Sequence, residues 1–144
     1  MNAVTFLQGA YQMELLVQSK MEQIEALRSL AAKVTACMGP EPVVSHTPNH
    51  SAMEDTVIKI MEAEEELNRK IDALVDQKLE IGRVIDQVQD PTLRLILEKR
   101  HLLFYQWEEI ALDLGLTVRW ALARHQEAVG VVQGILDGEE IGRI

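Results

Sequence analysis

Apolar residues recur at alternating steps of three and four along the first part of the chain, over about residues 5–38. This spacing places them on one face of a helix, and the segment contains no proline and a single glycine, Gly9. The seam consists of Ala10, Met13, Val17, Lys20, Ile24, Leu27, Ala31 and Val34, so that it is interrupted by one charged residue, Lys20, and it is widened by Leu16, Met21 and Leu30. The pattern therefore predicts a long packing helix, and its wide stripe favours a helical bundle over a strict two-stranded coiled coil.

A proline-rich stretch ends this helix. Gly39, Pro40 and Pro42 interrupt the pattern, because proline lacks a backbone donor and blocks the preceding turn. We expect a loop over about residues 39–51. Ser51 and Glu54 have the spacing of a capping box, which predicts that the next helix begins there.

A second segment without proline covers about residues 52–89. Apolar residues recur at every seventh position in it, at Ile60, Leu67, Leu74, Ile81 and Val88. A helix of this length spans roughly 55 Å. It is too long for one small core, so we expect it to pack on the first helix, on another subunit or on both. Residues 1–89 are thus predicted to form a helical hairpin or oligomerisation stalk, with a homodimer as the expected assembly.

The last third of the chain, residues 90–144, begins with a helix start signal. Asp90 has the residue type of an N-cap, and Pro91 suits the first helical position. The buried side of this helix is expected to hold Leu93, Ile96, Leu97, Leu102 and Leu103. A break is expected at residues 104–106.

The next segment, residues 107–124, meets several demands of a helix-turn-helix, in which two short helices cross at a fixed angle. Ile110 and Leu114 supply apolar contacts, and the small Ala111 permits close approach of the second helix. Gly115 stands where the turn needs a left-handed backbone.

The second helix of this motif follows at once. Leu116 would fill the corner, Thr117 can cap the helix, and Ala121 would face the crossing. Trp120 belongs either to the core or to a contact surface. The alternative interpretation of the segment is an ordinary helical hairpin with a glycine C-cap.

Composition supports an all-α class, because hydrophobic residues make up 47% of the chain and aromatic residues only 4%. No apolar run reaches the roughly 18 residues that span a bilayer, and no secretory signal is visible at the N-terminus. Cys37 is the single cysteine, which suits a reducing compartment. We therefore expect a cytoplasmic protein.

The net charge of −9 is unusual for a protein that binds nucleic acid. Residues 1–89 carry 8 basic and 14 acidic side chains, and residues 90–144 carry 6 and 9, so that the two parts have charges of −6 and −3. Neither part is basic, and only a local arrangement of cations could serve DNA.

Residues 90–129 resemble region 4 of bacterial sigma factors, and most of all the small phage and prophage transcription regulators of the ArpU and RinA type. The shared pattern consists of Asp90, Arg94, the run Leu97-Glu98-Lys99-Arg100-His101, the run Trp107-Glu108-Glu109-Ile110-Ala111, and Leu114-Gly115. The resemblance implies a module that binds promoter DNA and acts with RNA polymerase in a bacterial host. Glu127 departs from the pattern, because a cation is common at its position.

The expected DNA interface lies on the outward face of the second helix. Its residues are Thr117, Val118, Arg119, Leu122, Ala123 and Gln126. Arg119 and Gln126 can hydrogen-bond to base edges. Phosphate contacts are expected from Arg94, Lys99, Arg100 and Arg124.

A second function stays open, because the net charge is acidic and the second helix carries few cations. In this alternative, the chain is a protein-interaction module that engages RNA polymerase, a host factor or a phage protein. The sequence predicts no enzyme, cofactor, metal site, membrane partner or small-molecule substrate. His46 and His50 do not form a metal-binding pattern because Pro48 lies between them, and we expect His101 and His125 at a helix surface or interface.

Overall fold

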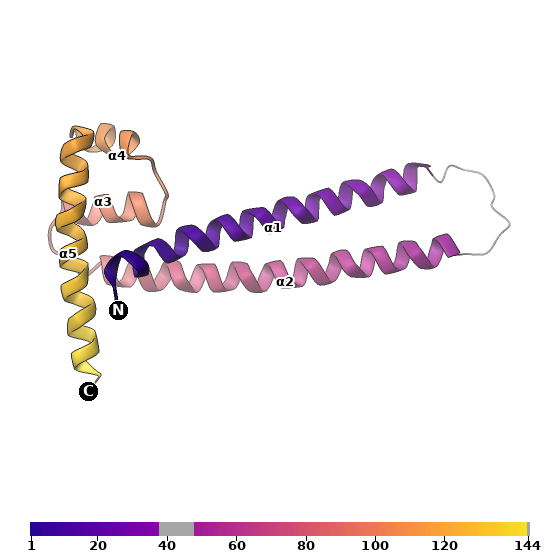
Figure 1. The fold of residues 1–144 in the computed structure, drawn as a ribbon, viewed down its shortest axis with the longest axis horizontal. Coiled ribbons are helices and arrows are strands. Elements are labelled where there is room, and N and C mark those ends of the chain that lie inside the picture. The colour runs from indigo at the N-terminus through magenta and orange to yellow at the C-terminus, as the bar shows by residue number, and fades with distance from the viewer. Residues whose placement is uncertain (38–47, 144) are drawn as a thin grey trace. The chain divides into compact units, whose positions relative to one another are not determined.

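The computed structural model describes residues 1–37 and 48–143, apart from the side chains of residues 35, 37 and 48–52. These residues form helices α1 (Ala3–Cys37), α2 (Pro48–Ile85), α3 (Pro91–His101), α4 (Trp107–Leu114) and α5 (Val118–Gly142) (Figure 1). No strand occurs in the part of the chain that is described. The predicted all-α class is confirmed.

The chain divides into two compact units. The two-helix unit comprises Leu15–Ala73, and the five-helix unit comprises Met1–Glu14 together with Leu74–Ile144. This division differs from the boundary expected between residues 89 and 90. The reason is that the first turns of α1 and the last turns of α2 are buried in the five-helix unit, at residues such as Leu7, Ile81 and Ile85.

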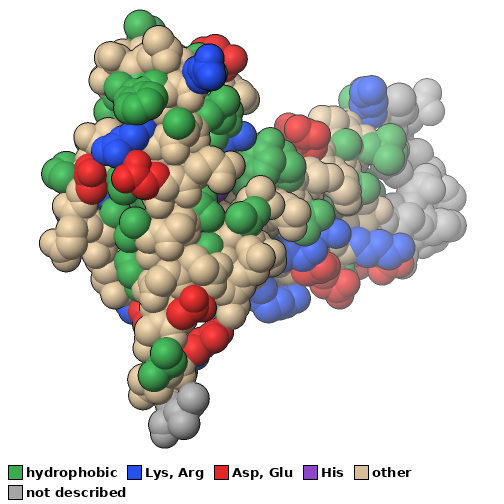
Figure 2. All heavy atoms as spheres, turned by 60° about the vertical axis from the view of Figure 1, so that its left-hand side comes forward, with side chains coloured by type: hydrophobic (Ala, Val, Ile, Leu, Met, Phe, Trp, Pro, Cys, Tyr) green, Lys and Arg blue, Asp and Glu red, His purple; other side chains and the backbone are tan. Residues whose placement is uncertain are grey.

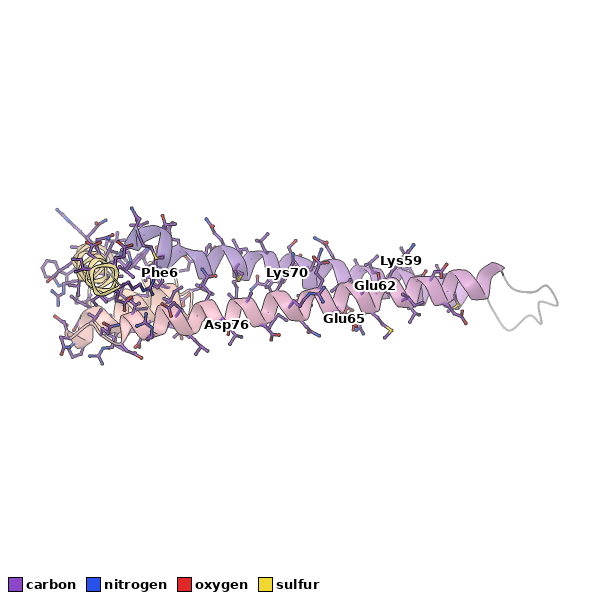
Figure 3. The ribbon with its side chains drawn as sticks, turned by 90° about the horizontal axis from the view of Figure 1, so that it is seen from below. Phe6, Lys59, Glu62, Glu65, Lys70 and Asp76 are labelled. Atoms are coloured by element: carbon purple, nitrogen blue, oxygen red, sulfur yellow. The ribbon has the colours of Figure 1, made fainter. Side chains whose placement is uncertain are left out.

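In the two-helix unit, segments of α1 and α2 lie side by side (Figure 3). Val17 and Ile24 of α1 and Ile60 of α2 are buried, and Arg28 forms an ion pair with Glu64. Several acidic side chains of α2 are exposed to solvent, Glu62, Glu65 and Glu66 among them. A narrow apolar stripe and flanking charges therefore hold this unit together.

The apolar stripe predicted for the first helix is wider than the buried one. Leu16, Met21, Leu27, Leu30 and Val34 are all exposed. One neighbouring helix covers only a narrow face, so the residues that flank the seam remain in solvent.

Two predicted ends of α2 are wrong. The helix begins at Pro48, so Ser51 lies inside it and is not the N-cap of a capping box. Proline suits this position because its fixed φ matches the first helical turn. The helix ends at Ile85 rather than at residue 89. Of the predicted loop, residues 39–47 lie outside the described part of the chain.

The five-helix unit has a continuous apolar core. Its fully buried larger side chains are Leu7, Ile81, Val84, Ile85, Val88, Ile96, Leu97, Ile110 and Val132. Helix α5 contacts both α3 and α4. Asp90 caps α3 by accepting hydrogen bonds from the backbone N–H groups of Thr92 and Leu93, at 2.9 and 3.4 Å. The predicted start of α3 is confirmed.

The predicted break after α3 is also confirmed, but one predicted core residue is wrong. Because α3 ends at His101, Leu103 no longer follows the helical period and is 57% exposed. Phe104 has a left-handed backbone with φ of 60°. Its ring lies edge-on to Tyr11, with centroids 5.4 Å apart, and the Lys78 ammonium lies 4.8 Å from its centroid.

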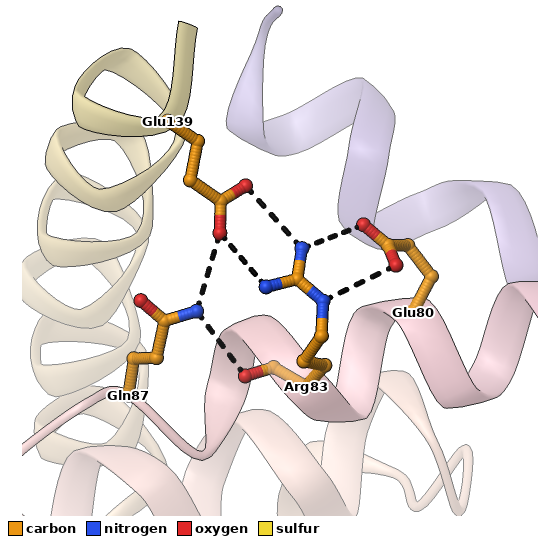
Figure 4. Close-up of polar contacts among 4 residues, drawn as sticks. All are labelled: Glu80, Arg83, Gln87 and Glu139. Carbon is orange, nitrogen blue, oxygen red and sulfur yellow. Dashed lines mark hydrogen bonds and ion pairs between the residues drawn. The ribbon is translucent and has the colours of Figure 1, made fainter. Parts of the chain in front are cut away.

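Helix α5 is longer than the short second helix and tail expected from the sequence, since it comprises 25 residues. Its buried residues continue past the turn to Val132 and Leu136, which extends the packed face. Figure 4 shows that Arg83 of α2 lies between Glu80 of the same helix and Glu139 of α5. None of the described helices has the length and apolar character to cross a membrane.

Candidate nucleic-acid interface

The connection between α4 and α5 is a tight turn with defined hydrogen bonds. Gly115 adopts a left-handed backbone, with φ of 68° and ψ of 31°. The N–H of Leu116 donates to the carbonyl oxygen of Ala111 at 2.9 Å, which satisfies a carbonyl at the end of α4. Thr117 then caps α5, because its hydroxyl accepts from the N–H of Trp120 at 3.1 Å. Gly115 and Thr117 therefore have the local roles expected of them.

One side of this pair of helices is buried. Ile110 and Ala111 of α4 and Ala121 of α5 are almost entirely inaccessible, and Leu114 and Leu116 are half-buried. Alanine at positions 111 and 121 leaves room for close approach of the two helices, because its side chain is a single methyl group. The burial of these residues on the inner side of the helix pair thus agrees with the sequence prediction.

The opposite side of α5 is exposed. Its first three turns present all six residues that the sequence assigned to DNA contacts, and these are Thr117, Val118, Arg119, Leu122, Ala123 and Gln126. They are brought together on one surface because α5 is continuous and Ala121 and Ala128 hold its other side in the core.

Trp120 is 56% exposed, so the alternative that placed it in the core is wrong. Ala121, the next residue, occupies the core position, and the helical turn of about 100° per residue directs Trp120 to the side. Leu112 of α4 is 82% exposed. The surface around the turn therefore contains exposed apolar side chains beside the polar ones.

The four cations expected at phosphates all have partners inside the five-helix unit. Arg94 donates to the carbonyl oxygen of Val88 at 3.0 Å. The Lys99 ammonium lies 3.2 Å from the carboxylate of Asp113. These contacts fasten α3 to its surroundings.

The other two cations make similar contacts. Arg100 donates to the carbonyl oxygen of Tyr105 at 2.9 Å, and its guanidinium lies over the Trp107 ring. Arg124 bridges the carboxylates of Asp90 and Glu127 at 3.1 and 2.7 Å. Each guanidinium retains further N–H groups, but none of the four cations projects freely from the surface.

Arg119 differs from these four residues. It is exposed, and it forms no hydrogen bond or ion pair within the described part of the chain. Figure 2 shows that, on the visible face of the five-helix unit, Lys and Arg side chains are separate from one another and some lie beside acidic side chains. Arg119 is therefore the cation of this surface that is most available to an anionic ligand.

The sequence analysis missed a direct contact between two histidines. The Nε2 atoms of His101 in α3 and His125 in α5 lie 2.8 Å apart. The helical spacing could have indicated this contact. His101 lies four residues after the core residue Leu97, and His125 lies four residues after Ala121, so each histidine is on the buried face of its helix. The described residues contain no group of three or more His, Cys, Asp or Glu side chains suited to a metal ion.

No protein-family model, no curated protein and no solved structure matches this chain.

Proposed function

We propose that α4, the turn at Gly115 and the first turns of α5 constitute a helix-turn-helix, and that the chain is a DNA-binding transcription regulator of phage or prophage genes. The observation that carries the proposal is the two-sided character of α5. Ala121 and Ala128 are buried on one side, whereas Arg119 and Gln126 are exposed on the other. A helix presented in this way can enter the major groove, which admits one α-helix.

In this proposal, Arg119 and Gln126 read base edges, and Val118 and Leu122 contact thymine methyl groups. Arg94, Lys99, Arg100 and Arg124 would contact phosphates with the N–H groups that their intramolecular partners leave free. Residues 1–89 would hold two copies together, so that two recognition helices address adjacent half-sites. The resemblance to sigma factor region 4 supports the same function and stays a prediction.

The direct test is binding to a pool of duplexes with a random 20-base-pair segment, followed by sequencing of the bound fraction. The full-length protein is expected to enrich a defined sequence, and its affinity for that duplex should fall steeply between low and moderate salt. Failure to enrich any sequence, together with salt-independent binding, would remove the proposal.

The Arg119→Ala variant tests the assigned face. We expect it to lose about 1–3 kcal/mol of binding to the enriched duplex, because a bidentate contact between arginine and guanine is worth that much discrimination. Fluorescence anisotropy measures the loss. Arg143→Ala is the matched control, since Arg143 is also exposed but lies just beyond the other end of α5. Equal effects of the two substitutions would show that net charge, and not this face, determines binding.

A second function is favoured by a different observation. The four expected phosphate cations have intramolecular partners, and the exposed surface around the turn includes Trp120, Leu122 and Leu112. Exposed aromatic and aliphatic groups of this kind are typical of protein interfaces. In this alternative, the module binds a protein such as bacterial RNA polymerase. Purified polymerase should then bind the chain without DNA, and Trp120→Ala should weaken that complex more than Arg119→Ala does.

A further inference from the structure

Two histidines from different helices meet inside the five-helix unit. The rings of His101 in α3 and His125 in α5 stack with centroids 5.1 Å apart, and their Nε2 atoms are within hydrogen-bond distance, at 2.8 Å. His101 is only 8% exposed. The Trp107 ring of α4 covers His125 edge-on, with centroids 4.8 Å apart. Little of this contact is therefore open to solvent.

The contact requires a particular distribution of protons. A hydrogen bond between two imidazoles needs one N–H donor and one bare acceptor nitrogen. His101 also hydrogen-bonds to the backbone of Leu7 in a way that favours protonation. Both contacts are satisfied when Nδ1–H of His101 donates to the carbonyl oxygen of Leu7 and Nε2 of His101 accepts the N–H of His125. When both rings are protonated, each Nε2 carries an N–H group, no acceptor nitrogen remains between them, and the hydrogen bond is lost.

The surrounding charges oppose protonation. Arg100 of α3 is the cation that acts on both rings, and each ring would repel the other once charged. The α4 side contributes the uncharged ring of Trp107, and the α1 side the uncharged backbone of Leu7.

Burial is the largest cause of the lowered pKa of both rings. Burial, the other imidazole and Arg100 lower the pKa of His101 to about 3. Burial and Arg100 lower the pKa of His125 to about 4. In an open state with both rings in water, each pKa would return to about 6.5.

We propose that the contact between His101 and His125 is a proton-operated latch between α3 and α5, closed by neutral rings and opened by the uptake of two protons. The direction follows from linkage, because the open state binds more protons than the closed state at any pH below about 6.5. The latch is thus fully effective above that pH and weakens progressively as the pH falls toward 4. This inference goes beyond DNA binding and does not depend on it.

The test is amide hydrogen exchange of the full-length protein at pH 6.5 and pH 5, corrected for the intrinsic exchange rates. Ordinary carboxylates stay largely ionised in this interval. If both rings titrate only when the latch opens, the opening constant for amides of α3 and of residues 118–128 should rise about 250-fold. If only one ring titrates on opening, the opening constant should rise about 16-fold instead.

Two variants separate the latch from general acid sensitivity. His125→Gln keeps an N–H donor for His101 but cannot be protonated, so the rise should drop to about 16-fold. In the double variant His101→Gln/His125→Gln, the rise should vanish. A wild-type rise no larger than that of the double variant would overturn the proposal.

A measurement on the wild-type protein alone covers the case in which these variants do not fold. In an NMR titration of the folded protein, both rings are expected to titrate below pH 5. Either ring titrating near pH 6.5 while the protein remains folded would contradict the latch.

Discussion

At the scale of single residues, the turn between α4 and α5 depends on the backbone of Gly115. Its φ of 68° lies in the left-handed region, and an added Cβ would meet no atom within 4 Å. The requirement for glycine is therefore conformational and not one of space. The sequence predicted this correctly, because a glycine directly after an apolar helical segment is a common C-cap.

Gly115→Ala is expected to lower the free energy of unfolding by about 1–2 kcal/mol, the strain of a left-handed backbone in a residue with a Cβ. Urea unfolding followed by circular dichroism measures this change. Gly130→Ala is the control, because Gly130 lies in the helical interior of α5 with open space around it. That substitution should raise stability by about 0.5–1 kcal/mol. A destabilising Gly130→Ala would show that the conformational argument fails for this chain.

For other single residues, exposure and interaction partners could not be predicted from the sequence. The helical spacing of apolar residues in the sequence placed Ala121 in the core, but it did not show which residues would pack against it. Trp120 is a large apolar residue and yet is exposed, because exposure is decided by its angle on the helix and not by its type. Arg124 is held by Asp90, which lies 34 residues away in the chain, and no local pattern indicates such a pair.

At the scale of helices, both the start of α3 and the start of α5 are defined by side chains that accept backbone hydrogen bonds. Asp90 accepts from two N–H groups at the start of α3, and Thr117 accepts from one at the start of α5. Both were predicted, because N-capping depends on the residue type and on a few neighbours. The start of α2 was predicted wrongly, since Pro48 and Ser51 are both acceptable starts by local rules.

Thr117→Ala should therefore cost about 1 kcal/mol of unfolding free energy, because the N–H of Trp120 loses its acceptor. Thr117→Ser keeps the hydroxyl and should retain most of the stability. Thermal unfolding of the two variants in parallel makes the comparison. If both variants lose the same stability, the Thr117 hydroxyl does not stabilise the start of α5.

At the scale of the whole molecule, the two units differ in how much they bury. The five-helix unit has side chains such as Ile85, Ile96 and Ile110 with no exposed surface. The two-helix unit instead exposes many of its larger apolar side chains, Leu30 and Met61 among them. Burial of apolar surface is the main favourable contribution to stability. The five-helix unit should therefore resist opening more strongly.

Hydrogen exchange at pH 7 is expected to show this difference. Amides around Ile96 and Ala128 should be the most protected, whereas those around Leu30 and Met61 should exchange first. Mass spectrometry of peptic fragments resolves the two groups. Comparable protection in both units would mean that residues 15–73 are stabilised by something other than the contacts described, such as a second copy of the chain.

The sequence by itself determined the helical class, the residues that start α3 and α5, the break after α3 and the left-handed turn at Gly115. These features depend on spacing and on interactions within a few residues. Only the tertiary structure decided that the first turns of α1 and the last turns of α2 join the core of α3, α4 and α5, and that α5 continues to Gly142. It also decided that His101 meets His125 and that the expected phosphate cations have internal partners. These features depend on residues far apart in the chain, whose proximity follows from packing and leaves no local pattern.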